Sequence, residues 1–88
     1  MPTISMFFGI IIRMYYAPGE DNPPHIHGYY QDSKIVIGIH DCEIIGGHIP
    51  ARQLRLIQAW IEIHRDELLA DWELCQNGEK PFKIEPLK

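Results

Sequence analysis

Residues 50–78 constrain the fold most, because no other segment is long enough to cover a sheet. Their apolar residues recur at steps of three, four and seven, which places them on one side of an α-helix. These residues are Leu54, Ile57, Ile61, Leu68, Trp72 and Cys75. Pro50 suits a first helical turn, and Gly78 can take the left-handed conformation that ends a helix. A break near His64 is the alternative, but the apolar stripe keeps its phase and favours one continuous helix.

The chain before residue 50 has the composition of β-strands, with many isoleucines and aromatics and an alternating pattern. The expected strands span residues 3–8, 10–16, 25–30, 34–40 and 44–45, with a loop at 17–24 and an extended segment at 82–87. Gly9 marks a bulge or a bend, Gly46-Gly47 ends the last strand, and the extended segment either adds an edge strand or lies on a partner. Residues 1–88 are therefore expected to form a single α+β domain, with a small, mostly antiparallel β-sheet and one long C-terminal α-helix packed on one face.

The chain is acidic, with 12 Asp and Glu against 8 Lys and Arg and a net charge of −4. Bulk charge therefore does not favour a phosphate backbone as ligand, and direct contact with nucleic acid is not expected. Arg52 and Arg55 are one turn apart in the expected helix and are candidates to contact an acidic partner. A solvated helix face is the simpler interpretation of the same pair.

Two cysteines, Cys42 and Cys75, form no metal motif by spacing, and Cys75 lies on the apolar stripe as a small core residue. The apolar run at residues 6–12 has no preceding basic residue and no small-residue cleavage site, and it is far too short to span a membrane. We therefore expect a cytoplasmic protein with reduced thiols and no membrane association.

The most distinctive motif is Asn22-Pro-Pro-His-Ile-His. In a strand, His25 and His27 project from the same face with Cα atoms about 6.6 Å apart, which lets two imidazoles reach one divalent transition metal such as zinc. The candidates for a third ligand are His40, Asp41, Glu43 and His48. Alternatively, both histidines are polar residues of a solvated face or bond to the preceding loop.

Other catalytic sets are poorly supported. Serine and threonine are few, and Cys42 lies beside Asp41 and His40 in a tight turn, where nucleophile and base rarely face each other. His64 falls on the apolar stripe and is better explained as a satisfied boundary residue. We expect that the protein is not an enzyme.

Several segments together resemble the bacterial family called domain of unknown function 4160. They are Met1-Pro-Thr-Ile, Gly9-Ile-Ile-Ile-Arg-Met-Tyr, Asn22-Pro-Pro-His-Ile-His, the start of the helix at 52–56, His64-Arg-Asp-Glu-Leu-Leu, Asp71-Trp-Glu-Leu and Ile84-Glu-Pro-Leu. The resemblance implies a small α+β protein with no assigned reaction, often encoded beside another small protein in a toxin–antitoxin-like pair. It draws attention to His25, His27, the loop before them and Arg13.

The leading hypothesis is a non-enzymatic protein-interaction module whose partner is a small protein encoded by the adjacent gene. The candidates for partner or ligand contact are Arg13, Asn22, Tyr29, Arg52 and Arg55. A homodimer would also help so short a chain to bury enough apolar surface. A metal-binding protein or metal-dependent enzyme using His25 and His27 is the alternative, and a nucleic-acid-binding regulator is the weakest.

Overall fold

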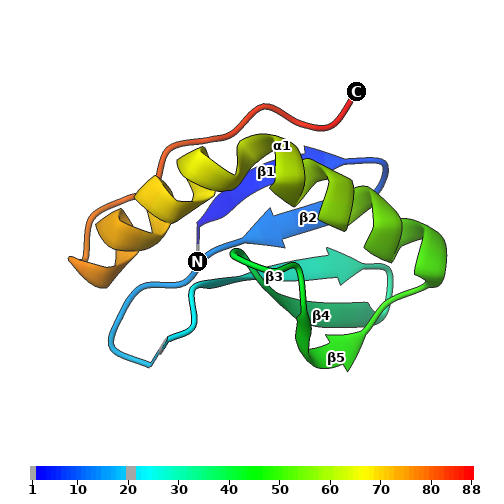
Figure 1. Ribbon diagram of the computed structural model, residues 1–88, viewed down its shortest axis with the longest axis horizontal. Coiled ribbons are helices and arrows are strands. Elements are labelled where there is room, and N and C mark those ends of the chain that lie inside the picture. The colour runs from blue at the N-terminus through cyan, green and yellow to red at the C-terminus, as the bar shows by residue number, and fades with distance from the viewer. Residues whose placement is uncertain (1, 20–21) are drawn as a thin grey trace.

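The computed structural model describes residues 2–19 and 22–88. Within these residues the chain forms five strands followed by one helix: β1 Thr3–Phe7, β2 Ile10–Arg13, β3 His25–Tyr30, β4 Ser33–Gly38, β5 Ile44–His48 and α1 Ala51–Gln76. The strands form an antiparallel sheet in the order β1-β2-β3-β4-β5, so each strand pairs with its neighbour in the sequence (Figure 1). The expected α+β architecture is confirmed.

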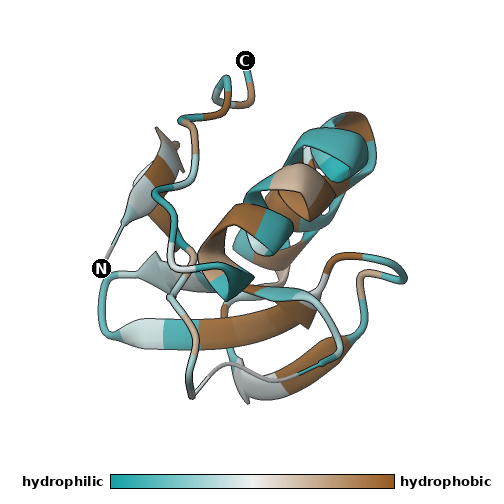
Figure 2. Cartoon of the chain, turned by 90° about the vertical axis from the view of Figure 1, so that its left-hand side faces the viewer, coloured by the Kyte–Doolittle hydropathy of each residue, from teal (hydrophilic) through white to brown (hydrophobic). Residues whose placement is uncertain are grey.

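Helix α1 lies across one face of the sheet, and the opposite face carries no helix in the described chain (Figure 2). The stripe predicted from spacing lies on the buried side of α1, where Ile57 and Ile61 are joined by Trp60, which the predicted stripe did not include. It packs on isoleucines of the inner sheet face, namely Ile4, Ile10, Ile12, Ile26, Ile35 and Ile37. Gly28 permits the close approach of helix and sheet, because a Cβ atom there would lie 3.0 Å from Cδ1 of Ile57.

The helix runs as one element but bends at His64, whose backbone angles of φ −113° and ψ 22° are not helical. The preference for one continuous element and the alternative of a break near His64 are therefore both partly right. At the bend, Nδ1 of His64 lies 2.6 Å from Oε1 of Glu67, and the centre of the imidazole ring lies 5.7 Å from that of the Trp60 ring. The half-buried histidine is thus satisfied, as its place on the stripe predicted.

Several predicted strand limits were wrong. Strand β2 ends at Arg13 and β4 at Gly38, both earlier than expected. Strand β5 instead runs through the glycines to His48, because Gly46 and Gly47 pair with β4. Gly9 lies in the turn between β1 and β2, and the irregular register falls between Thr3 and Ser5. The β-propensity of the residues placed the strands, but hydrogen-bonding register set where they end.

The C-terminal segment after α1 runs beside β1 without forming a strand (Figure 1). We call residues 79–88 the tail. Its Ile84 N–H donates to the Ile4 carbonyl at 2.8 Å, and its Phe82 N–H donates to Oδ1 of Asp71 at 2.9 Å. The indole N–H of Trp60 donates to the carbonyl of Glu85 at 2.8 Å. Of the two alternatives for this segment, the edge strand does not form, and the alternative of lying on a partner stays a prediction. Side chains of α1 hold much of the tail in place.

Asp71 provides a pH-dependent contact to this tail. Its side chain is buried, Oδ2 has no hydrogen-bond partner among the described residues, and burial raises the pKa of the carboxyl group above its usual 3.8, with the Glu67 charge adding to the effect. A raised pKa in the folded state means that the native protein binds more protons than the unfolded chain, so this group lowers stability as pH rises through the window between the two pKa values.

We therefore expect Asp71→Asn to be more stable than the native protein at pH 7, because it keeps an acceptor for the Phe82 N–H and loses the buried charge. The difference should vanish as pH falls toward 4. Asp71→Ala should instead lower the free energy of unfolding by about 1–3 kcal/mol, because the Phe82 N–H loses its acceptor. Urea unfolding between pH 4 and 8 measures both, and a constant difference between Asp71→Asn and the native protein would contradict the assignment.

No helix in the described part of the chain has the length and hydropathy needed to cross a membrane.

Candidate functional site

The uncovered face of the sheet carries a cluster of aromatic and cationic side chains. In β2 and β3 the buried residues Ile12, Ile26 and Gly28 face α1, so the alternating residues Arg13, His27 and Tyr29 face the other way. Arg13 lies directly opposite His27 in the antiparallel register. Tyr15 follows β2 and His25 begins β3, and we call Arg13, Tyr15, His25, His27 and Tyr29 the tyrosine–histidine cluster.

Contacts within the cluster join its members closely. The hydroxyl groups of Tyr15 and Tyr29 are hydrogen-bonded to each other. The ring of Tyr15 meets the ring of His27 edge-on with centroids 4.5 Å apart, and the guanidinium carbon of Arg13 lies 5.1 Å from the centre of the Tyr29 ring. This last contact has the geometry of a cation–π interaction. The cluster is therefore ordered by packing within itself, with its side chains only partly buried.

His25 links the cluster to the helix. Its ring lies 5.3 Å from that of His27 and 4.9 Å from that of Trp72, and its Nδ1 lies 2.8 Å from the carbonyl oxygen of Pro23. A hydrogen bond from Nδ1 to a carbonyl fixes the tautomer in which Nε2 carries the lone pair. The two imidazoles thus stand near each other, and one is oriented by the loop that precedes β3.

A metal centre needs a further ligand. Across the residues that the structure describes, no group of three or more His, Cys, Asp or Glu is arranged to hold a metal ion. Asp41 and Glu43 lie in the turn after β4, where Oδ1 of Asp41 accepts the Glu43 N–H at 3.0 Å. His40 is exposed before the same turn, and His48 ends β5. Zinc binding by His25 and His27 stays a prediction.

A hollow of about 400 Å³ adjoins the cluster on the same face. Its lining includes Tyr15, His27, Tyr29, Lys34, Val36 and Gly46. The register explains this grouping, since His27 lies opposite Val36 and Val36 opposite Gly46, while Tyr29 lies opposite Lys34. Directly paired residues of neighbouring strands share a face. The hollow is therefore bounded by side chains of the two central hairpin strands and by the glycines of β5.

The comparison with protein families decides what kind of chain this is. The model of the family described as "Domain of unknown function (DUF4160)" matches residues 9–73, well over half of the chain. The chain belongs to the DUF4160 family. No curated protein and no solved structure matched it. The matched segment contains the whole tyrosine–histidine cluster of this DUF4160 chain.

Of the residues proposed for contact in this DUF4160 chain, Tyr29 lines the hollow, and Arg13 lies on the Tyr29 ring without lining it. Asn22 is exposed in the loop before β3, and Arg52 and Arg55 are exposed in the first turns of α1. None of the three lines the hollow. Arg13 and Tyr29 are brought together, whereas Lys34 was not predicted from the sequence. The alternation of the strands and the register of the second hairpin could have placed Lys34 beside Tyr29.

The thiols of the DUF4160 chain are not activated. Burial is the largest influence on Cys42 and raises the pKa of its thiol, although Arg65 nearby acts in the opposite direction. Burial likewise raises the pKa of Cys75 to about 11. Since the thiolate is the nucleophile, neither cysteine has the environment of a catalytic thiol. Arg65 is engaged by Glu62 and by the carbonyl of Ile39, at 2.9 Å from its Nε.

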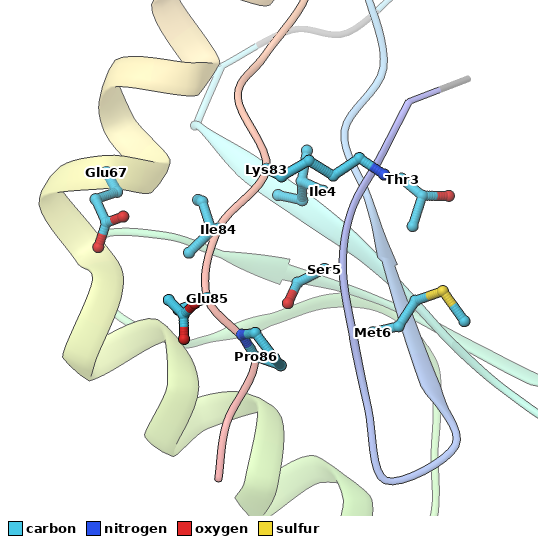
Figure 3. Close-up of a pocket in the computed structure, with 9 residues that line it drawn as sticks. All are labelled: Thr3, Ile4, Ser5, Met6, Glu67, Lys83, Ile84, Glu85 and Pro86. Carbon is cyan, nitrogen blue, oxygen red and sulfur yellow. The ribbon is translucent and has the colours of Figure 1, made fainter.

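A second hollow, of about 470 Å³, lies between β1 and the tail (Figure 3). Ser5 and Met6 of β1, Lys83 and Glu85 of the tail and Glu67 of α1 contribute to its lining. The Ser5 hydroxyl is directed from β1 toward the tail and is buried without a hydrogen-bond partner among the described residues. Ile4 and Ile84, whose hydrogen bond joins the tail to β1, also line this groove.

Proposed function

We propose that this protein is a non-enzymatic protein-interaction module that binds a small partner protein through the uncovered face of its sheet. The observation that supports the proposal is the tyrosine–histidine cluster itself. Tyrosine and arginine are enriched at the centres of protein interfaces, where rigid aromatic side chains with a polar tip supply contact area at low entropic cost. Here the Arg13 guanidinium lies on the Tyr29 ring and the two tyrosine hydroxyls are joined, so the anchors are already ordered.

The partner that we propose is the product of the adjacent gene, in a pair of the toxin–antitoxin-like kind. Further large apolar side chains reach solvent at the β1 edge of the sheet, with Met6 exposed by 61% and Phe8 by 55%. Exposed apolar side chains at the rim of an aromatic centre are what a protein partner would cover. The small size of the chain agrees with a protein that gains stability from association.

Co-expression with the adjacent gene product tests the proposal. We expect co-elution from size-exclusion chromatography at micromolar concentration and measurable heat on mixing. A double substitution, Tyr15→Ala with Tyr29→Ala, should reduce the affinity by at least about 2 kcal/mol if these residues are interface anchors. Two separate peaks and no heat would count decisively against the proposal, and light scattering on the protein alone shows whether it forms a homodimer instead.

A further inference from the structure

We propose that the uncovered sheet face recognises an acidic segment of the partner protein, with a carboxylate seated in the hollow beside the tyrosine–histidine cluster. This inference rests on the proposed function and adds the chemistry of the partner. Three observations carry it: the distribution of charge over the fold, the placement of two cations around the paired tyrosines, and the open space above Gly46.

Charge is segregated between the sheet and the rest of the chain. Within the bounds given above, the five strands contain Arg13, Lys34 and three histidines but no aspartate or glutamate. The acidic residues of the described chain instead occupy the turns, the tail and α1, which holds Glu62, Asp66, Glu67, Asp71 and Glu73. A protein with a net charge of −4 therefore has a sheet whose strands carry cations alone. Such a surface is complementary to an acidic partner.

The two cations flank the aromatic pair. Arg13 stands opposite His27, and Lys34 stands opposite Tyr29, in successive rows of one face. Nε of Arg13 is oriented by the Thr3 hydroxyl at 3.4 Å, while its guanidinium carbon lies over the Tyr29 ring. A guanidinium held in this way can offer its edge to a carboxylate, for which its fork of donors is suited. Lys34 lines the hollow and supplies a second positive charge, while Arg13 lies beside the hollow, on the ring of Tyr29, which lines it.

The hollow has room for such a group. Gly46 continues the row of Arg13, His27 and Val36 across the sheet. A Cβ atom on Gly46 would meet no atom within 4 Å, so the space beside it is open. A larger residue at this position would therefore fill the hollow without disturbing the strands. This gives a steric probe of the site that leaves every charge in place.

Aromatic and cationic side chains on a sheet can also bind single-stranded nucleic acid. The acidic balance of the chain disfavours this ligand, because non-specific binding to phosphates depends on an excess of positive charge. A carboxylate-bearing peptide needs only the local cations Arg13 and Lys34. The observations thus favour the acidic peptide, and an RNA oligomer serves as a contrasting probe.

The test is an NMR titration of the full-length, 15N-labelled protein with the peptide Glu-Glu-Tyr-Glu-Glu. The matched probes are Gln-Gln-Tyr-Gln-Gln, with blocked ends, and a U12 RNA. We expect shifts of the amide signals of residues 13, 15, 27, 29, 34 and 46 with the glutamate peptide and much smaller shifts with the glutamine peptide. Arg13→Gln and Gly46→Val should each weaken binding about tenfold, in line with the loss of one charge-assisted contact or of the space for it. Lys80→Gln, at the exposed start of the tail, is the matched charge control and should leave binding unchanged.

Shifts that fall on α1, equal binding of both peptides, or tighter binding of U12 at the same residues would each overturn the inference. Failure of this inference and failure of the proposed function are distinguishable. If the partner protein binds Arg13→Gln and Gly46→Val as tightly as the native protein, recognition of an acidic segment is refuted, but the proposed interaction module stands. If the glutamate peptide binds as expected but the adjacent gene product forms no complex, the proposed partner is refuted and the carboxylate site stands.

Discussion

Gly47→Ala should destabilise the protein by more than about 3 kcal/mol, a large share of the roughly 4–13 kcal/mol expected for a domain of this length. Gly47 has a φ angle of +74°, and a Cβ atom there would lie 2.3 Å from the carbonyl oxygen of Lys34. The left-handed conformation alone costs an alanine about 1–2 kcal/mol. The clash is with backbone rather than with a flexible side chain, so relieving it must separate β5 from β4.

The chain offers a closely matched control in Gly46→Ala. Gly46 is the preceding residue of the same strand, and a Cβ atom there would have no neighbour within 4 Å. We therefore expect this variant to remain within about 0.5 kcal/mol of the native protein. Urea unfolding followed by circular dichroism compares the two, and equal losses would show that β5 tolerates a side chain at Gly47. In a folded but weakened Gly47→Ala protein, binding at the adjacent hollow should fall as well.

The elements with a strong period were predictable from sequence, and their contacts were not. The stripe from Leu54 to Cys75 identified the helix and its buried side, because a spacing of three and four residues has one structural solution. The same spacing could not locate the bend, which depends on how His64 meets Trp60 and Glu67. The glycine pair of β5 predicts a strand end, but Gly46 and Gly47 pair with β4, because pairing depends on a register that residue type does not reveal.

For the candidate site, too, the sequence predicted which residues share a strand face but not which residues of different strands meet. His25 and His27 were placed on one face because alternate residues of a strand share a side, and the structure puts their rings 5.3 Å apart. Lys34 was missed because its neighbours come from the opposite strand, and only the register brings it to Tyr29. Arg52 and Arg55 were proposed from charge and helical spacing, which say nothing of the distance between the helix and the sheet face that carries the cluster.

Trp60→Ala should destabilise the protein by about 3–5 kcal/mol, the range observed when a large buried aromatic side chain is removed. Trp60 is fully buried, its ring lies 5.3 Å from that of Phe7 in β1, and its indole N–H donates to the carbonyl of Glu85 in the tail. One side chain thus joins the helix, the edge strand and the tail. Its loss should leave a cavity at the point where all three meet, and thermal unfolding followed by circular dichroism measures the cost.

Trp60→Phe separates the two parts of this role. Phenylalanine keeps most of the contact with Phe7 but cannot donate to Glu85, so we expect a loss of about 1 kcal/mol, close to the net worth of one hydrogen bond. The tail should loosen more than the sheet does. Amide exchange of Ile84, which is bonded to the Ile4 carbonyl, should quicken, while exchange of the β3 amides changes only with the global stability. If the phenylalanine variant were as unstable as the alanine variant, the hydrogen bond rather than the buried ring would be the main stabilising contribution of Trp60.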